Sequence, residues 1–258
     1  MREILDTLPL LAILPITLVV VLIAIEIGFH AGRWRVRSLG GKSESEAQLS
    51  AMTGAHLALL AFIMAFSFNM AAGHYQDRRA LIMKDANAIS TAYLRTSLVD
   101  SAESRNISEL LVQYVDVRLT FKDAKTAGPG LAKTQELQEL IWSEVQQLVS
   151  NHTPTVLHSL LIQSLNEVFD VHDERAAAGL KHRVPSSLWI ILAALLVLSM
   201  TGIGYFSGHK GVRNPIASTG LALSFSMVLF LIADLDRPTG GLLKADQSAI
   251  FELRQQLN

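Results

Sequence analysis

Four stretches of this sequence are long and apolar enough to cross a lipid bilayer as single helices. A spanning helix needs about 20 mainly apolar residues, at a rise of about 1.5 Å per residue. Within the four stretches Glu26 and His56 are the only acidic, basic or histidine residues. The whole chain is 17% charged, below the roughly 25% that is usual for soluble domains. The sequence therefore predicts a multi-pass membrane protein with spans at 8–29, 50–72, 187–207 and 214–233.

A polar stretch at 73–185 separates the spans into two pairs. Its apolar residues recur at helical spacing, and no alternating strand pattern occurs. We therefore predict an all-α membrane protein with four transmembrane helices in two pairs and a helical extramembrane insert between the second and the third. The expected domains are the first pair of spans, the insert, the second pair, and an interfacial motif with an amphipathic C-terminal helix: 1–72, 73–185, 186–233 and 234–258.

Glycine and proline positions predict where several helices begin and end. Residues 74–99 contain neither, so the second span is expected to continue as one long helix beyond the membrane. "TAGPG" at 126–130 predicts a turn, Pro154 separates the next two helices, and Pro185 marks the start of the third span. The tail predicts a short amphipathic helix that lies on the membrane or against the insert, with one face formed by Leu243, Ile250, Phe251 and Leu257.

The composition argues against several classes of function. A net charge of −1 gives no basis for nucleic-acid binding. The absence of cysteine excludes disulfides, thiolate catalysis and Cys-ligated metal centres. The sequence also contains no nucleophile elbow, Walker loop or dinucleotide-binding loop. We therefore expect no enzymatic activity and no cofactor, with a bound cation such as calcium as the one exception.

Basic residues in the short loops indicate which side of the membrane each segment faces. They follow the first span and lie between the third and fourth spans: Arg33, Arg35, Arg37, Lys42, Lys210 and Arg213. By the positive-inside rule these loops are cytoplasmic, so the insert and both termini are expected on the other side. The basic residues of the C-terminal tail argue the opposite way.

The second span has a patterned face. At about 100° per residue, Phe62, Phe66, Asn69 and Gly73 lie within an arc of about 60°. Such a stripe suits a narrow hydrophobic gate, with Asn69 as a polar step within it. The alternative is ordinary helix packing, in which Asn69 makes an interhelical hydrogen bond.

The segment "ADLDRPTGG" at 233–241 ends the fourth span with two carboxylates. Carboxylates at a helix C-terminus are disfavoured by about 0.3–1 kcal/mol each, so Asp234 and Asp236 require a positive partner. In one interpretation Arg237 and arginines of the insert supply that charge and the motif only ends the span. In the other, the aspartates hold a cation or form the mouth of an ion pathway.

Further charged residues flank the membrane on the same face as this motif. We predict a charged collar that either anchors the insert or, repeated around an oligomer, concentrates ions: Asp77, Arg78, Arg79, Asp173, Glu174, Arg175, Asp234, Asp236 and Arg237. Glu26, near the end of the first span, is expected to reach Arg33 rather than to act as a relay group. Gly204 and Gly208 are expected to allow close approach of another helix.

Three segments resemble the bacterial bestrophin-like family: "HYQDRRALIMKDANAISTAYLRT", "HDERAAAGLKHRVP" and "LFLIADLDRPTGG". The resemblance covers nearly the whole chain and implies a distant relation to bestrophins, which are pentameric anion channels in animals with cation-selective bacterial relatives. It implies that Phe62 and Phe66, one helical turn apart, line a pore neck. It also implies that Asp234 and Asp236 correspond to a reduced calcium-binding cluster. Bestrophins keep the insert in the cytoplasm, which conflicts with the arginine distribution, and we retain the assignment from the arginines.

Two functional hypotheses follow. The first is an oligomeric, pentameric ion channel in a bacterial plasma membrane, with the second span lining the pore, Phe62 and Phe66 forming a constriction, and the aspartates favouring cations. The second is a non-conducting sensor or scaffold whose helical insert binds a partner or ligand.

Overall fold

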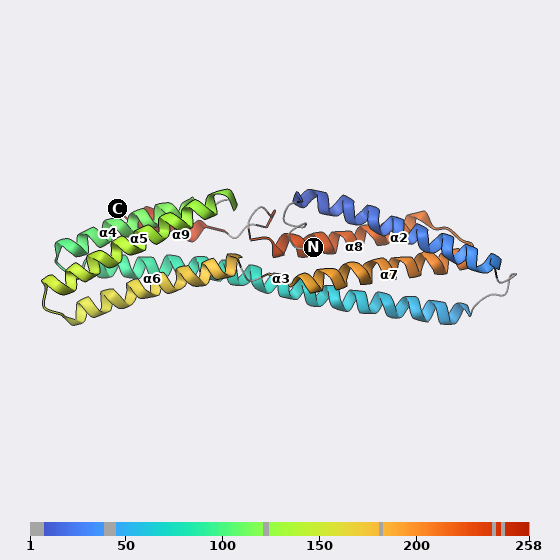
Figure 1. Ribbon diagram of the computed structural model, residues 1–258, viewed down its shortest axis with the longest axis horizontal. Helices are drawn as coiled ribbons and strands as arrows, with labels where there is room; N and C mark the ends of the chain where they lie inside the picture. Colours follow the sequence, from blue (N-terminus) through green and yellow to red (C-terminus); the bar gives the residue numbers. More distant parts are fainter. Residues whose placement is uncertain are drawn as a thin grey trace. The chain divides into compact units, whose positions relative to one another are not determined.

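The computed structural model describes residues 8–38, 45–120, 124–180, 183–238, 241–243 and 246–257. Regular structure in these ranges is helical, and no strand occurs in them (Figure 1). The helices are α2 (Leu10–Ser38), α3 (Glu46–Thr96), α4 (Ala102–Leu119), α5 (Ala124–Asn151), α6 (Val156–Leu180), α7 (Ser186–Lys210), α8 (Pro215–Asp236) and α9 (Ser248–Gln256). The all-α prediction is confirmed.

Four of these helices, α2, α3, α7 and α8, are long and apolar enough to span a bilayer. Each overlaps one of the four predicted spans over nearly its whole length, so the predicted number and order of the spans are confirmed. α3 runs for 51 residues without a break, as expected from the lack of glycine and proline after Gly73. The other predicted helix starts also hold, since α6 begins after Pro154 and α7 begins directly after Pro185.

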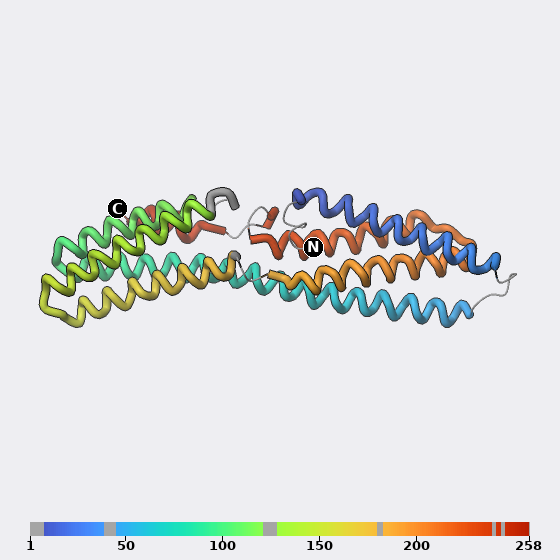
Figure 2. The backbone as a smooth tube through the Cα atoms, in the orientation of Figure 1, coloured from blue at the N-terminus to red at the C-terminus, as the bar shows by residue number. Residues whose placement is uncertain are grey.

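The chain divides into two compact units, and α3 contributes to both of them (Figure 2). The membrane unit consists of Met1–Gly73 and Arg183–Arg237. The helical unit consists of His74–His182 and Pro238–Asn258.

Close backbone contact holds the membrane unit together where α2 packs against α7. A Cβ atom added to Gly204 would lie 1.9 Å from the carbonyl oxygen of Ile25, and one added to Gly28 would lie 2.0 Å from that of Thr201. Gly208 and Gly32 are equally tight, at 2.1 and 2.3 Å from the carbonyl oxygens of Phe29 and Tyr205. Only glycine permits this separation, so the role predicted for Gly204 and Gly208 is confirmed.

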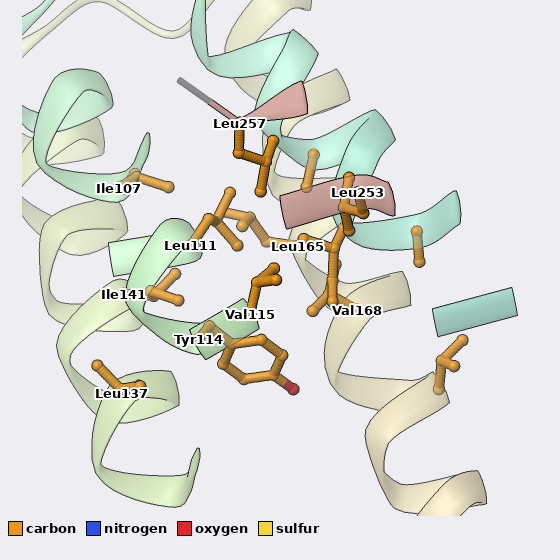
Figure 3. Close-up of a cluster of buried hydrophobic side chains, with 14 of the residues drawn as sticks. Ile107, Leu111, Tyr114, Val115, Leu137, Ile141, Leu165, Val168, Leu253 and Leu257 are labelled. Atoms are coloured by element: carbon orange, nitrogen blue, oxygen red, sulfur yellow. The ribbon is translucent and has the colours of Figure 1, made fainter. Parts of the chain in front are cut away.

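The helical unit has an apolar core contributed by α3, α4, α5, α6 and α9. Apolar residues at helical spacing on α4, including Ile107, Leu111 and Val115, are fully buried and belong to the same cluster as Leu165 and Val168 of α6 (Figure 3). α4 begins at a capped end, because the Ser101 hydroxyl accepts a hydrogen bond from the Ser104 amide at 3.0 Å. The amphipathic periodicity predicted for the insert is therefore the packing pattern of this bundle.

The structure differs from the predicted turn at 126–130 and decides the position of the C-terminal helix. The turn predicted at 126–130 is wrong, because this stretch opens α5 and Pro129 lies inside the helix. Pro129 is the sixth residue of α5, beyond the first four amides that lack a helical partner, so the helix continues through it with one backbone hydrogen bond fewer. The C-terminal helix α9 lies against α4, the second of the two predicted positions, with Ile250 buried and Phe251 56% exposed.

Candidate functional site

The predicted stripe on α3 points away from the helices of its own chain. Phe62 is 67% exposed and Phe66 is 50% exposed, and Asn69 is exposed as well. Nothing lies within 4 Å of a Cβ atom placed on Gly73. The face of α3 that does pack within the membrane unit carries other residues, among them the fully buried Leu60.

α3 is also the span that its own chain covers least. In its most apolar 18-residue window 11% of the residues are buried, against 28–33% in the corresponding windows of α2, α7 and α8. The hydroxyl of Ser199 on α7 donates a hydrogen bond to the His56 carbonyl at 3.2 Å, which identifies the covered side of α3. The stripe is thus left for contact with lipid, with another chain or with water.

At the end of α8, the "ADLDRPTGG" aspartates are buried, with 2% of Asp234 and 2% of Asp236 exposed. The Asp236 carboxylate accepts a hydrogen bond from the Val184 amide at 2.7 Å and lies 3.4 Å from the Arg183 guanidinium. The Arg237 guanidinium donates to the Leu8 carbonyl at 2.7 Å. This geometry favours the structural interpretation for Asp236, because its two oxygens bind donors of the α6–α7 connection.

The predicted collar residues belong to both units, and each is described within its own unit. In the helical unit, Glu174 binds Lys84 at 2.9 Å, and Lys84 also lies 3.6 Å from Glu167. Arg175 donates to Asp85. Asp77, Arg79 and Asp173 are exposed, and Arg78 is buried. The partners described here for Glu174, Arg175 and Asp236 are Lys84, Asp85, Val184 and Arg183, which are not collar residues.

A buried ionic cluster, which sequence reasoning missed, lies in the helical unit. Arg175 and Arg118 both bind the carboxylate of Asp85, which is fully buried, with the Arg118 Nε atom 3.4 Å from its oxygen. Arg118 also donates to the Tyr114 hydroxyl at 2.5 Å and contacts the His172 Nδ1 atom at 2.7 Å. The other Asp85 oxygen has no hydrogen-bond partner among the described residues. Two guanidinium groups thus share one carboxylate inside the protein.

This environment shifts the titration of both neighbouring side chains. Burial, followed by the positive charge of Arg118, lowers the pKa of His172 to about 4. Burial raises the pKa of Tyr114 to about 12, and the Arg118 charge opposes that rise. Since Arg118 is a permanent donor, His172 Nδ1 accepts the hydrogen bond, and the imidazole is neutral at pH 7.

A sequence signal for the cluster exists. Arg118 continues the buried face of α4 after Ile107, Leu111 and Tyr114, at spacings of four, three and four residues. An arginine on an apolar stripe must have a buried partner, because an unpaired charge in the core is very costly. The signal does not identify that partner.

The partner predicted for Glu26 is wrong. Glu26 accepts a hydrogen bond from Arg213 at 2.6 Å and lies 3.2 Å from the His30 Nε2 atom. Arg33 instead lies over the Phe29 ring, at 5.8 Å from its centroid. Arg213 comes from the loop between α7 and α8, which the packing of α7 on α2 brings to the end of α2.

Among the described residues, no group of three or more histidine and acidic side chains is placed to hold a metal ion. Asp234 and Asp236 therefore gain no third acidic or histidine ligand within that part of the chain.

The sequence profile of the bestrophin-like domain family matches residues 18–250, which is most of the chain. This chain belongs to the bestrophin-like domain family. The resemblance inferred from the three segments is thereby confirmed. No curated protein matches this bestrophin-like chain.

Solved structures share the fold. A variant of a bacterial bestrophin homologue from Klebsiella pneumoniae is 17% identical, with a TM-score of 0.68 over 97% of this chain and 98% of that one. A second variant from the same organism has the same identity and TM-score over 94% and 96% of the two chains. A structure described only as a membrane protein is 16% identical, with a TM-score of 0.67 over 96% and 97%. At this identity the likeness establishes that the bestrophin-like chain has the bestrophin fold.

Proposed function

We propose that this protein is an oligomeric ion channel of a bacterial plasma membrane, and that α3 lines its pore. The observation that carries the proposal is the orientation of Phe62, Phe66 and Asn69. All three project from the span that its own chain covers least.

The polarity of Asn69 favours a pore over simple lipid contact. A primary amide facing hydrocarbon loses the hydrogen bonds that water provides, which costs several kcal/mol on alkane transfer scales. Other copies of α3 around a water-filled axis would leave Asn69 solvated or bonded to a neighbouring copy. In such an assembly the exposed residues of the stripe need no contact with other helices of their own chain.

Phe62 and Phe66 are suited to a constriction. They lie one helical turn apart, so in a ring of copies each would contribute an apolar layer, and a narrow apolar passage can close by loss of water. The fold shared with the Klebsiella pneumoniae bestrophin homologue supports a channel of this kind. Assembly as a pentamer and a preference for cations belong to the same proposal.

The deciding experiment is conductance of the purified protein in planar lipid bilayers. Phe66→Ala removes an apolar layer of the constriction and is expected to increase the open probability or the conductance. Phe68→Ala is the matched control, because Phe68 is another exposed aromatic residue of α3 on a different face, at 38% exposure. Absence of conductance in the wild-type protein, or equal effects of the two substitutions, would contradict the proposal.

The proposed preference for cations is tested by substitution of Asp234. If the C-terminal end of α8 borders the pathway, Asp234→Asn is expected to shift the reversal potential in a salt gradient towards anions. Calcium titration of the same variant by calorimetry tests whether the carboxylate is also a metal ligand. Unchanged selectivity and unchanged calcium binding would leave Asp234 with a structural role.

A scaffold is the second candidate, favoured by apolar side chains exposed on the helical unit. Val156 is 75% exposed, Leu94 is 64% exposed and Leu98 is 56% exposed. Such residues suit a protein partner. Native mass spectrometry in mild detergent separates the candidates, because a monomer or dimer cannot enclose a central pore.

A further inference from the structure

The end of the membrane unit at which α2 stops carries excess positive charge. Its described charged residues are five cations and two carboxylates: Glu26, Arg33, Arg35, Arg37, Glu46, Lys210 and Arg213. Lys210 binds Glu46 at 3.1 Å, and Arg213 binds Glu26 at 2.6 Å. Both carboxylates are thus engaged, and Arg33 and Arg37 of α2 form the excess.

One aromatic ring brings two of these cations together. The Phe29 side chain is 3% exposed, and the Arg213 and Arg33 guanidinium carbons lie 4.3 Å and 5.8 Å from its centroid. One Arg213 N–H donates to Glu26 at 2.6 Å, and the remaining N–H groups of the two guanidiniums are held at the aromatic face, where they match the oxygens of a phosphate. The two groups come from different elements, so the packing of the unit preorganises them.

A third cation lies next to this pair. Arg37 follows Arg33 at a spacing of four residues, and like charges at this spacing repel on a helix surface. Both side chains are exposed, and neither lies within salt-bridge distance of a carboxylate in the described part of the chain. An anion between them would relieve the repulsion.

The depth of the site identifies the anion. These arginines directly follow the apolar run of α2, and Trp34 among them is 68% exposed. Exposed tryptophan is characteristic of the headgroup level of a bilayer, where arginine side chains extend to the interface. The anions concentrated at that level are the phosphates of lipids.

We propose that Arg33, Arg37 and Arg213 form a binding site for the headgroup of an anionic phospholipid. Arg33 and Arg213 grip the phosphate from positions fixed by Phe29, Arg37 adds charge one turn further along α2, and Trp34 packs against the lipid. The site is expected to prefer lipids whose headgroup has a net negative charge, because it contains more cations than carboxylates. The site does not depend on whether the protein conducts ions.

The test is lipid retention by the delipidated full-length protein in native mass spectrometry. Phosphatidylglycerol and phosphatidylcholine with identical acyl chains are titrated separately. Loss of two interfacial arginines, at about 1 kcal/mol each, is expected to weaken phosphatidylglycerol retention by about thirtyfold in Arg33→Gln/Arg37→Gln. Arg105→Gln/Lys133→Gln is the control, because it removes two exposed cations of the helical unit and is expected to retain the lipid as the wild type does.

Three outcomes would overturn the proposal. Wild-type protein could retain the two lipids equally, or the control variant could lose phosphatidylglycerol as strongly as Arg33→Gln/Arg37→Gln. In a third arm, soluble glycerol phosphate at the same concentration could displace phosphatidylglycerol fully. That result would indicate a small-anion site rather than a lipid site.

Discussion

The carboxylate of Asp85 on α3 accepts a hydrogen bond from the guanidinium of Arg175 on α6, although the two residues are 90 positions apart. Arg118 of α4 binds the same carboxylate, so one acidic group joins three helices of the helical unit. The two arginines have side-chain exposures of 14% and 1%. In this core, two guanidinium groups share the single negative charge of Asp85.

Substitution of Asp85 is therefore expected to destabilise the helical unit strongly. Asp85→Asn keeps the size of the side chain and removes the charge, which leaves two buried cations that repel each other. Removing one member of a buried ion pair costs about 3–5 kcal/mol. Chemical denaturation followed by circular dichroism measures the loss.

Asp116→Asn is the matched control for that experiment. Asp116 binds Arg254 at 2.6 Å, but its side chain is 51% exposed. Exposed pairs contribute about 0–1 kcal/mol, so this variant is expected to resemble the wild type. Equal losses in the two variants would show that Asp85 has no special role in the core.

Stability is expected to fall as the pH is lowered below about 6.5, because the pKa of His172 is lowered to about 4 in the folded protein. Between these values the unfolded chain binds a proton that the folded protein does not, so the free energy of unfolding decreases with decreasing pH and levels off below about pH 4. His172 is expected to contribute about 2 kcal/mol to the free energy of unfolding at neutral pH. This is less than the full pKa difference implies, because solvent screens part of the charge.

The pH effect is measured by denaturation of the wild type and of His172→Gln between pH 7.5 and 4.5. Glutamine does not titrate, and its carbonyl oxygen can still accept the Arg118 hydrogen bond. A flatter pH profile is expected for the variant. The same profile in both proteins would exclude His172 as the source of the effect.

Gly204→Ala is expected to disrupt the contact between α2 and α7. The new methyl group would lie 1.9 Å from the Ile25 carbonyl oxygen, so the helices must separate. Overpacking of this kind costs about 1–3 kcal/mol, and the midpoint of thermal unfolding in detergent should drop. Gly220→Ala has open space at its Cβ position and should leave the midpoint unchanged or slightly raised.

The orientation of the helical unit can be decided by cysteine labelling, because the native chain contains no cysteine. The arginine distribution predicts that Ser150→Cys on α5 reacts with a membrane-impermeant maleimide in intact cells. Ser38→Cys, at the end of α2, should react only after lysis. The reverse pattern would favour the cytoplasmic insert that the resemblance to bestrophins implies.

The membrane spans and the continuity of α3 could be predicted because they depend on local properties. Twenty apolar residues have few alternatives to a spanning helix, and the absence of glycine and proline after Gly73 favours one unbroken helix. The turn predicted at 126–130 is wrong because a Gly-Pro-Gly pattern disfavours a helix without excluding one. α5 continues through Pro129, its sixth residue, with the loss of one backbone hydrogen bond.

The ionic cluster and the partner of Glu26 could not be predicted, because they depend on which helices meet. Asp85 lies on the buried face of α3 between Ile82 and Ile89, which indicates a buried carboxylate. Its pairing with Arg175 requires α6 to lie beside α3, and no spacing in the sequence encodes that. The choice of Arg213 over Arg33 as the partner of Glu26 likewise follows from the packing of α7 on α2.

The glycine contact between α2 and α7 has a consequence for biosynthesis. Gly32 is translated long before Gly204, and at about 5–20 residues per second the interval lasts roughly ten to thirty seconds. During that time the groove on the nascent α2 has no α7 to fill it. In a bilayer, lipid tails cover that surface until α7 inserts, so the final docking of α7 on α2 displaces lipid.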